Sequence, residues 1–322
     1  MNLTNNHNLS LPLAILLAHD TYDHNNDIKT ISATFLLKPT RSIVLSLQNK
    51  KLDKEIDLSD LAPSTFGTAI HEFAESGWNN KKTLKKAMTA LGIADEIQER
   101  VVINPTNPTD KDIPIYVEKR SSRRIAGWTI TGKFDVVVNG RLSDYKITSV
   151  WGHMFDSDSD NYSKQGSIYK WLNSNIITDN VISIEKVFSD WQASKAKYDK
   201  NYPALRMVST EYPLMSMETI EIFILDKLKK IDTCLPLTKS NLPLCNDDEL
   251  WASGDVWKYY KKVGAKRATK NYTNSAEAYA RQAADGGEVK EFPGEVKRCK
   301  YCNVVEICDQ AKALTSAGRL KL

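Results

Sequence analysis

Alternation of apolar and polar positions predicts a block of strands in the middle of the chain, from Ile125 to Val150. Within it, the stretch GKFDVVVNGRLSDYK contains two strand-like runs joined by Asn139 and Gly140. An Asn-Gly pair between such runs favours a two-residue hairpin, because a type I′ turn needs a positive φ at both central residues. A further strand is expected from Val181 to Phe188.

Helical spacing of apolar residues is found on both sides of this block. One helix is expected to start after Pro63, where Ser64 and Thr65 are suitable caps, and helix propensity continues to about Leu91. Further helices are predicted to start near Ser32 in the stretch ISATFLLKPTRSIVL, and to span approximately 163–173 and 218–231.

The hairpin register predicts which side chains share a face of the sheet. In a two-residue loop Val138 faces Arg141, so Asp135 should lie directly opposite Asp144. By the same count Lys133 should lie opposite Lys146. Two facing carboxylates repel each other, and a divalent cation such as Mg²⁺ or Mn²⁺ would compensate. The alternative is a solvated face on which the two aspartates tolerate each other beside the lysines.

His71 lies on the expected helix before the strands, with Glu75 one turn further along the same face. A lone histidine on a half-apolar helix is typical of a packed or capping residue. A neutral imidazole is also a usable third ligand beside two carboxylates, and it shifts the preference towards Mn²⁺.

The cysteines predict a second metal site. Cys299, Cys302 and Cys308 lie within ten residues, as metal or cluster ligation requires, and the total of five is odd. This pattern favours a reducing, cytoplasmic compartment over a disulfide framework. Four thiolates accept either zinc or an iron-sulfur cluster, so the residues leave both open.

Composition and charge exclude some classes of protein. With 41% hydrophobic residues the chain can bury a core, and no apolar run approaches the roughly 18 residues of a membrane helix. The first residues lack the basic region of a signal peptide.

The formal net charge is only +4, but residues 257–300 contain 11 Lys and Arg against 5 Asp and Glu, with several tyrosines. Such a stretch binds nucleic-acid phosphates and bases or packs as a small subdomain.

In order along the chain, the motifs resemble those of the PD-(D/E)XK nucleases, in their RecB-like branch. The resemblance covers approximately residues 32–308, and each motif is weak alone. The motifs are Gly67-x3-His71, Gly132-x2-Asp135, Asp144-Tyr145-Lys146, Gln165-x3-Tyr169 and the cysteine spacing, which is similar to that of relatives with a C-terminal iron-sulfur cluster.

The resemblance implies an α/β (α+β) fold: a restriction-endonuclease-like core with a central mixed sheet flanked by helices. It implies that His71, Asp135, Asp144 and the backbone carbonyl of Tyr145 hold Mg²⁺ or Mn²⁺, and that Lys146 is the catalytic lysine. The expected domains are a helical N-terminal subdomain over 1–60, the nuclease core over 61–235, and a basic, cysteine-containing subdomain over 236–322.

Two further assignments concern Gln165 with Tyr169 and the fourth cysteine. In the family the Gln-Tyr pair contacts DNA, while an ordinary amphipathic helix is the alternative.

Relatives with the cluster usually carry their first cysteine in a segment like ISATFLLKPTRSIVL, which has none here. Cys245, in a polar segment, is then the better fourth ligand than Cys234, which reads as a small buried hydrophobe. The resemblance favours [4Fe-4S] over Zn²⁺.

The resemblance implies a metal-dependent DNase, an exonuclease or single-strand nuclease of recombination, repair or phage DNA metabolism. A helicase or an annealing protein is the expected kind of protein partner, beside the DNA itself. The alternative is a catalytically idle DNA-binding subunit that mediates recombination. The presence of His71, Asp135, Asp144 and Lys146 together favours the enzyme, since idle members usually lose a carboxylate or the lysine.

Overall fold

The computed structural model describes residues 2–19, 27, 29–49 and 55–322. The chain forms two compact units. Unit 1 comprises Met1–Leu37 and Lys51–Leu228, and unit 2 comprises Lys38–Lys50 and Lys229–Leu322. Residues 38–49, which the sequence analysis included in an N-terminal subdomain, therefore belong to the unit that carries the cysteines.

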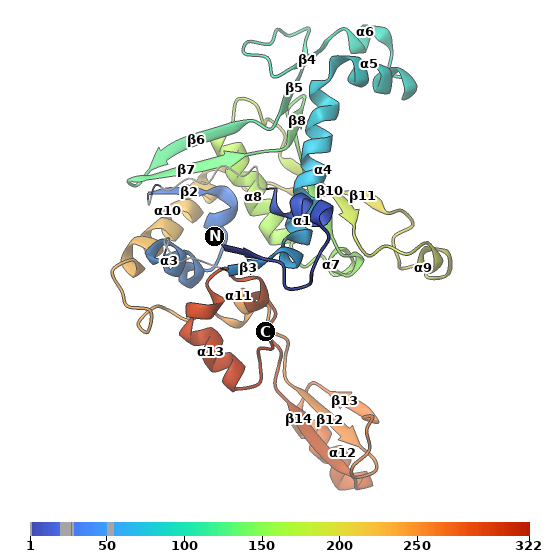
Figure 1. Ribbon diagram of the computed structural model, residues 1–322, viewed down its shortest axis with the longest axis vertical. Coiled ribbons are helices and arrows are strands. Elements are labelled where there is room, and N and C mark those ends of the chain that lie inside the picture. The colour runs from blue at the N-terminus through green and yellow to red at the C-terminus, as the bar shows by residue number, and fades with distance from the viewer. Residues whose placement is uncertain (1, 20–26, 28, 50–54) are drawn as a thin grey trace. The chain divides into compact units, whose positions relative to one another are not determined.

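A six-stranded mixed sheet forms the centre of unit 1 (Figure 1). The pairs β9–β10 and β4–β5 are parallel, and the other neighbouring pairs are antiparallel. In spatial order the strands are β11 (Met207–Pro213), β10 (Val181–Phe188), β9 (Arg141–Thr148), β8 (Val136–Val138), β5 (Ile113–Val117) and β4 (Val101–Ile103).

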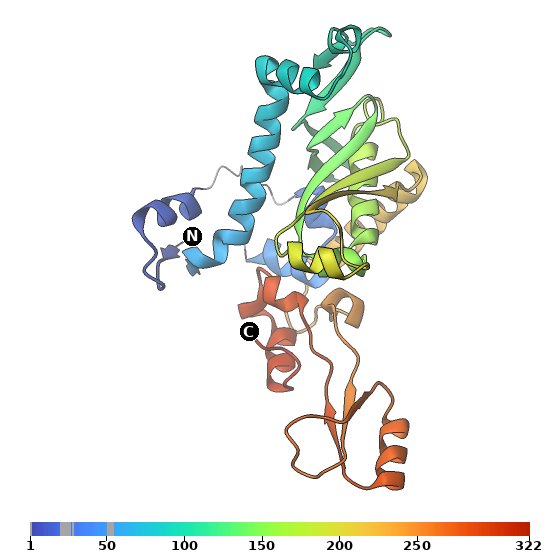
Figure 2. The ribbon, with the colours of Figure 1, turned by 90° about the vertical axis from the view of Figure 1, so that its right-hand side faces the viewer.

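Helices α4 (Ala62–Asn79) and α8 (Ser159–Leu172) lie on opposite faces of this sheet (Figure 2). Successive side chains of a strand point to opposite faces. Asp144 therefore contacts Gln165 of α8, whereas Tyr145 contacts Trp78 of α4. The predicted central mixed sheet flanked by helices is therefore confirmed.

The Asn-Gly hairpin forms with the predicted register. Val138 pairs with Arg141, and both turn residues have positive φ, 47° at Asn139 and 89° at Gly140. The pairing of Lys133 with Lys146 is wrong, because the β8–β9 ladder ends at Val136. Lys133 instead ends β7 (Trp128–Lys133) and pairs with Arg120 in a separate three-stranded sheet.

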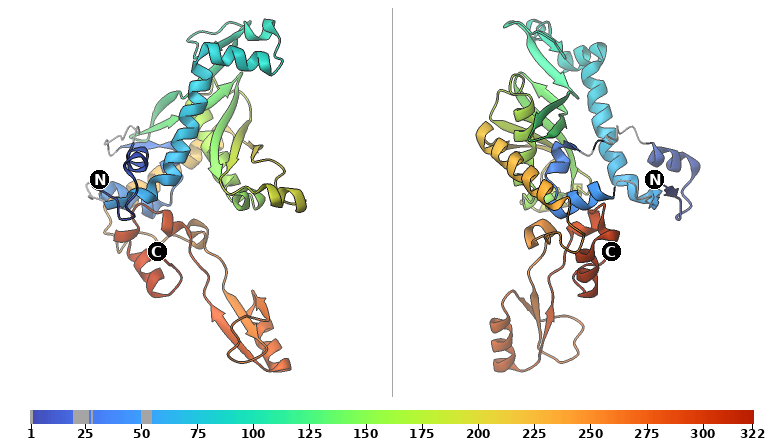
Figure 3. Two further views of the ribbon diagram at one scale, coloured as in Figure 1. Left: turned by 45° about the vertical axis from the view of Figure 1, so that its right-hand side comes forward. Right: turned by 90° about the vertical axis from the view of Figure 1, so that its left-hand side faces the viewer.

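That smaller sheet has the order β2-β7-β6, and a parallel pair β1–β3 lies near the N-terminus. At the end of the β10–β11 hairpin lies α9 (Ala193–Tyr198) (Figure 3). The remaining elements of unit 1 are β1 (Asn2–Thr4), α1 (Leu11–Ala18), β2 (Thr30–Ser32), α2 (Ala33–Leu36), β3 (Glu55–Asp57), η1 (Leu58–Leu61), α5 (Lys81–Ala90), α6 (Asp95–Gln98), β6 (Arg120–Ile125) and α7 (Val150–Met154). Helix α10 (Met217–Cys234) runs from unit 1 into unit 2.

Two predicted helices are each divided into two. Ser32 caps α2 as expected, but the helix is interrupted before α3 (Thr40–Gln48), because Pro39 has no N–H to donate. The helix expected to reach Leu91 breaks at Asn80, whose side chain caps α5 by accepting from the backbone of Thr83.

Unit 2 contains a three-stranded antiparallel sheet of order β13-β12-β14 and several short helices. No helix in the described part of the chain is both long enough and apolar enough to cross a membrane. Besides α3, the elements of unit 2 are α11 (Asp247–Leu250), β12 (Val256–Tyr260), β13 (Lys270–Tyr272), α12 (Ser275–Asp285), β14 (Glu288–Phe292), η2 (Arg298–Tyr301), η3 (Val305–Ile307) and α13 (Asp309–Ser316).

Candidate metal centre and cysteine cavity

Helix α4 and the β8–β9 hairpin bring His71 and Asp135 together in unit 1. Nδ1 of His71 lies 3.2 Å from Oδ1 of Asp135. The other carboxylate oxygen, Oδ2, accepts a hydrogen bond from the backbone N–H of Tyr145 at 2.7 Å. Asp135 is therefore fixed from both sides, although it lies one residue before the ladder of β8 begins.

Asp144 is the most deeply buried acidic group of the site, with 1% of its surface exposed. Its Oδ1 accepts from the amide of Gln165 at 3.0 Å, and its Oδ2 lies 2.5 Å from Nζ of Lys146. Burial raises the pKa of Asp144 to about 6, although the neighbouring lysine opposes this shift. The ion pair thus compensates only part of the cost of burying the carboxylate.

Lys146 lies on the same face of β9 as Asp144, two residues further along. Burial by itself lowers the pKa of Lys146, but the charges of Asp144 and Asp135 raise it more, and the net shift is upward. The side chain therefore remains an ammonium at neutral pH.

His71 remains one-third exposed at its side chain, so the site is open on the α4 side. The hydrogen bond to Asp135 raises the pKa of the imidazole, and burial opposes this shift. In the metal-free protein the proton shared with Asp135 favours the charged form of His71, and a metal ion would have to displace that proton.

Glu118 is a site residue that the sequence analysis missed. It follows β5 directly and has a φ of 50°, in the left-handed region that non-glycine residues seldom adopt. Its backbone N–H donates to the carbonyl of Asp135 at 2.8 Å, and its carboxylate contacts Lys133 and lies 4.0 Å from His71 Nδ1. Burial raises the pKa of Glu118. An acidic residue after an apolar run was its only sequence signal.

The chemistry of the donors fits a divalent cation. Ligand atoms of His71, Glu118 and Asp135 lie within 4.8 Å of one another. Carboxylate oxygens with one imidazole suit Mg²⁺ or Mn²⁺, and the partly compensated charge of Asp144 adds a further reason for a cation here. Asp144 itself is not a member of that group of three, and its oxygens contact Gln165 and Lys146.

Gln165 and Tyr169 lie on one face of α8, as predicted, and both are buried. Nε2 of Gln165 donates to Asp144 and also to the hydroxyl of Tyr169, each at 3.0 Å. Burial raises the pKa of Tyr169 well above its usual value, which keeps the phenol protonated. The pair therefore orients Asp144, and its predicted contact with DNA remains a prediction.

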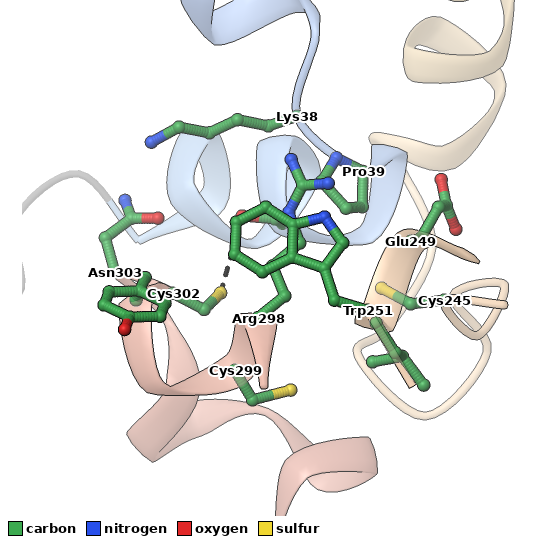
Figure 4. A pocket seen from close by; sticks show the side chains of 12 residues that line it. Lys38, Pro39, Cys245, Glu249, Trp251, Arg298, Cys299, Cys302 and Asn303 are labelled. Atoms are coloured by element: carbon green, nitrogen blue, oxygen red, sulfur yellow. Dashed lines mark hydrogen bonds between the residues drawn. The ribbon is translucent and has the colours of Figure 1, made fainter. Parts of the chain in front are cut away.

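Within unit 2 the cysteines gather around a cavity of about 200 Å³ (Figure 4). Cys245, Cys299 and Cys302 line it, in spite of the long sequence separation of the first from the others. Burial raises the pKa of the Cys245 thiol to about 12 and that of Cys299 to about 11. These thiols are thus neutral without a metal.

The segment 31–45 supplies Arg41 and Ser42 to the same place. Arg41 is 3% exposed, and its Nε donates to Sγ of Cys308 at 3.3 Å. Its other nitrogens donate to the carbonyls of Leu242 and Lys239. The hydroxyl of Ser42 lies 3.6 Å from Sγ of Cys302. Arg41 thus places a buried guanidinium directly beside Cys308.

Cys245 and Cys234 differ in their surroundings. The backbone N–H of Cys245 donates to Oε1 of Gln310 at 2.9 Å, and Nε2 of Gln310 donates to the carbonyl of Cys245 at 2.8 Å. Gln310 follows Cys308 by two residues. Cys234 is buried at the end of α10 and is not among the residues that line the cavity. Its structural role is therefore that of a small apolar side chain.

Comparison with known proteins gives only a distant likeness. No protein-family model and no curated protein matches the chain. Among solved structures, a phage-related exonuclease from Haemophilus somnus 129PT is 14% identical, at a TM-score of 0.36, and the match covers 61% of this chain and 81% of the other. An alkaline exonuclease from Laribacter hongkongensis is 9% identical, also at 0.36, with 65% and 91% covered. These likenesses do not show what the chain does.

Proposed function

We propose that the chain is a metal-dependent deoxyribonuclease of the PD-(D/E)XK type, an exonuclease or single-strand DNase. The observation that carries the proposal is the arrangement of His71 and Asp135 at 3.2 Å beside Asp144, which is paired with Lys146. A buried acidic site next to a lysine that remains charged is the environment that phosphodiester hydrolysis requires.

His71, Asp135 and Asp144 would hold Mg²⁺ or Mn²⁺ with the backbone carbonyl of Tyr145, and Glu118 is a further candidate. When bound, such an ion lowers the pKa of water and stabilises negative charge on a phosphate. The N–H of Tyr145 fixes the orientation of Asp135, and the amide of Gln165 fixes that of Asp144. The protein thus holds these carboxylates in place before substrate arrives.

Lys146 would contribute charge rather than a base. The raised pKa keeps its ammonium protonated, so it cannot accept a proton from water at neutral pH. It can instead stabilise the negative charge that develops on the phosphate in the transition state. Its contact with Asp144 keeps the ammonium close to the carboxylates.

The direct test is to incubate the full-length protein with end-labelled single- and double-stranded DNA, with Mn²⁺ or Mg²⁺ and without either ion. We expect release of nucleotides only when an ion is present. Asp144→Asn, purified identically, controls for contaminating nucleases and should be inactive. DNA binding without cleavage under all conditions would instead indicate the catalytically idle DNA-binding subunit.

We further propose that Cys245, Cys299, Cys302 and Cys308 bind a [4Fe-4S] cluster that stabilises unit 2. Cys245, Cys299 and Cys302 line a cavity of about 200 Å³. The resemblance favours a cluster over a single zinc ion, and Arg41 would offset part of the cluster's negative charge.

Elemental analysis of anaerobically purified protein tests this assignment. Iron should be present at about four atoms per chain, and Cys245→Ser and Cys302→Ser should both deplete it. Cys234→Ser is the matched control and should leave the iron content unchanged. One zinc per chain without iron would indicate a zinc site instead of a cluster. Loss of the metal in Cys234→Ser alone would contradict the proposed set of ligands.

A further inference from the structure

Residues 256–292, here called the 256–292 module, form a small ββαβ fold inside unit 2 (Figure 1). Strand β12 lies between β13 and β14, and α12 packs on one face of the sheet. Tyr259, Tyr272 and Ala278 form the core on that face, together with Trp257 and Val289. Trp257, Tyr259 and Tyr272 therefore pack in the core of a small subdomain, which was the alternative to contact with nucleic-acid bases.

The opposite face of the module carries two directly paired lysines. Lys258 of β12 pairs with Lys290 of β14 and with Asn271 of β13, and paired residues point to the same side. On the same face, Val256 pairs with Phe292. Two ammonium groups in directly opposed positions repel each other, and the carboxylate of Glu288, 3.1 Å from Nζ of Lys290, offsets part of this repulsion.

Aromatic rings lie beside both ammonium groups. Nζ of Lys258 is 4.2 Å from the ring centroid of Phe292, and Nζ of Lys290 is 5.2 Å from that of Tyr260. Phe292 is 38% exposed, although it is a large apolar side chain on a polar face. A ring and lysines side by side are the combination that stacks on a base and contacts its phosphates.

The charge of the module supports an anionic ligand. Its 37 residues contain 8 Lys and Arg against 4 Asp and Glu, so its formal charge equals the +4 of the whole chain. Among its acidic groups, Glu288 is already engaged by the N–H of Gly264 and by Lys290. The loop 261–269 that contains Gly264 adds Lys261, Lys262, Lys266 and Arg267.

We infer that this lysine face of the module, formed by Lys258, Lys290 and Phe292, binds single-stranded nucleic acid. The lysines would contact consecutive phosphates, and Phe292 would stack on an unpaired base. A duplex is disfavoured because its bases already stack on one another. The inference rests on the proposed function for the choice of DNA, but it concerns binding and not cleavage.

Fluorescence anisotropy of a labelled oligothymidine tests the inference, with full-length protein and no added divalent ion. Lys258→Glu should weaken binding at least tenfold, since it places a negative charge at the phosphate site. Lys270→Glu makes the same change in charge, but Lys270 pairs with Tyr259 and so faces the α12 side. This control should change binding less than threefold.

The aromatic contact has its own control. Phe292→Ala should weaken binding about fivefold or more. Tyr279→Ala, on α12 and 50% exposed, should have little effect. The dependence of affinity on salt should fall by about 0.7 in log–log slope for each lysine removed from the face. Circular dichroism checks that each variant is folded.

Equal loss of binding in Lys258→Glu and Lys270→Glu would overturn the inference, because only general charge would then matter. Unchanged binding in Lys258→Glu and Phe292→Ala would overturn it as well. Failure of the nuclease proposal is seen separately, as an absence of cleavage by a protein that still binds oligothymidine through this face. Tighter binding to duplex than to single strand would contradict the assignment of the substrate class.

Discussion

The backbone of Gly132 lies directly against the ring of Tyr169. A Cβ at Gly132 would lie 3.0 Å from Cδ1 of Tyr169 and 2.7 Å from Cδ1 of Leu172, closer than carbon atoms normally approach. Because Tyr169 is hydrogen-bonded to Gln165, which orients Asp144, this close approach of β7 to α8 connects packing to the candidate metal centre.

Gly132→Ala should therefore destabilise the protein by about 1–3 kcal/mol, the usual cost of overpacking a buried contact. Gly67→Ala is the matched control, since nothing lies within 4 Å of a Cβ at that position of α4. It should stabilise the helix by about 0.5–1 kcal/mol. Denaturant unfolding measures both, and a neutral Gly132→Ala would mean that α8 moves away freely.

Asp144 predicts a pH dependence of stability in the metal-free protein. Its pKa is raised from an ordinary 3.8 to about 6, so folding favours the neutral carboxyl. The contribution of Asp144 to the free energy of unfolding should then be greatest below pH 4 and fall by roughly 2–3 kcal/mol as the pH rises to about 6. Asp144→Asn should remove this slope. A wild-type slope of the opposite sign, attributable to Asp144, would contradict the burial argument.

Glu118 is expected to contribute to metal affinity. Its carboxylate lies in the same group as His71 and Asp135, so Glu118→Gln should weaken Mn²⁺ binding about tenfold, as loss of one ligand or of its orienting partner does. Glu185→Gln, a change of the same kind on β10, is the control and should be neutral. Isothermal titration distinguishes the two, and equal affinities would exclude Glu118 from the site.

Local patterns predicted much of the fold, because they act over a few residues. The turn at Asn139 and Gly140 fixed the register of β8 and β9, and the strand from Val181 to Phe188 has the bounds that were expected. The same register predicted a pair of Lys133 with Lys146, which is wrong because the chain passes from one sheet to another at Phe134. The alternation of apolar and polar residues does not indicate such a change of sheet.

The candidate site was predictable only for those residues that belong to motifs of a known order along the chain. His71, Asp135, Asp144 and Lys146 were predicted in this way. Glu118 reaches the site through a positive φ and the carbonyl of Asp135, which are properties of the folded backbone. Arg41 likewise meets Cys308 across 267 residues, which no spacing rule indicates.

We propose that Lys146 acts on the substrate beside a metal ion that the other site residues hold. The most direct measurement is the rate of Mn²⁺-dependent DNA cleavage by Lys146→Ala at equal Mn²⁺ occupancy, with binding followed by titration calorimetry. We predict an Mn²⁺ affinity within a few-fold of wild type and turnover at least a hundredfold lower, because the variant loses charge stabilisation but no ligand. Near wild-type turnover, or loss of Mn²⁺ binding, would contradict this role of Lys146.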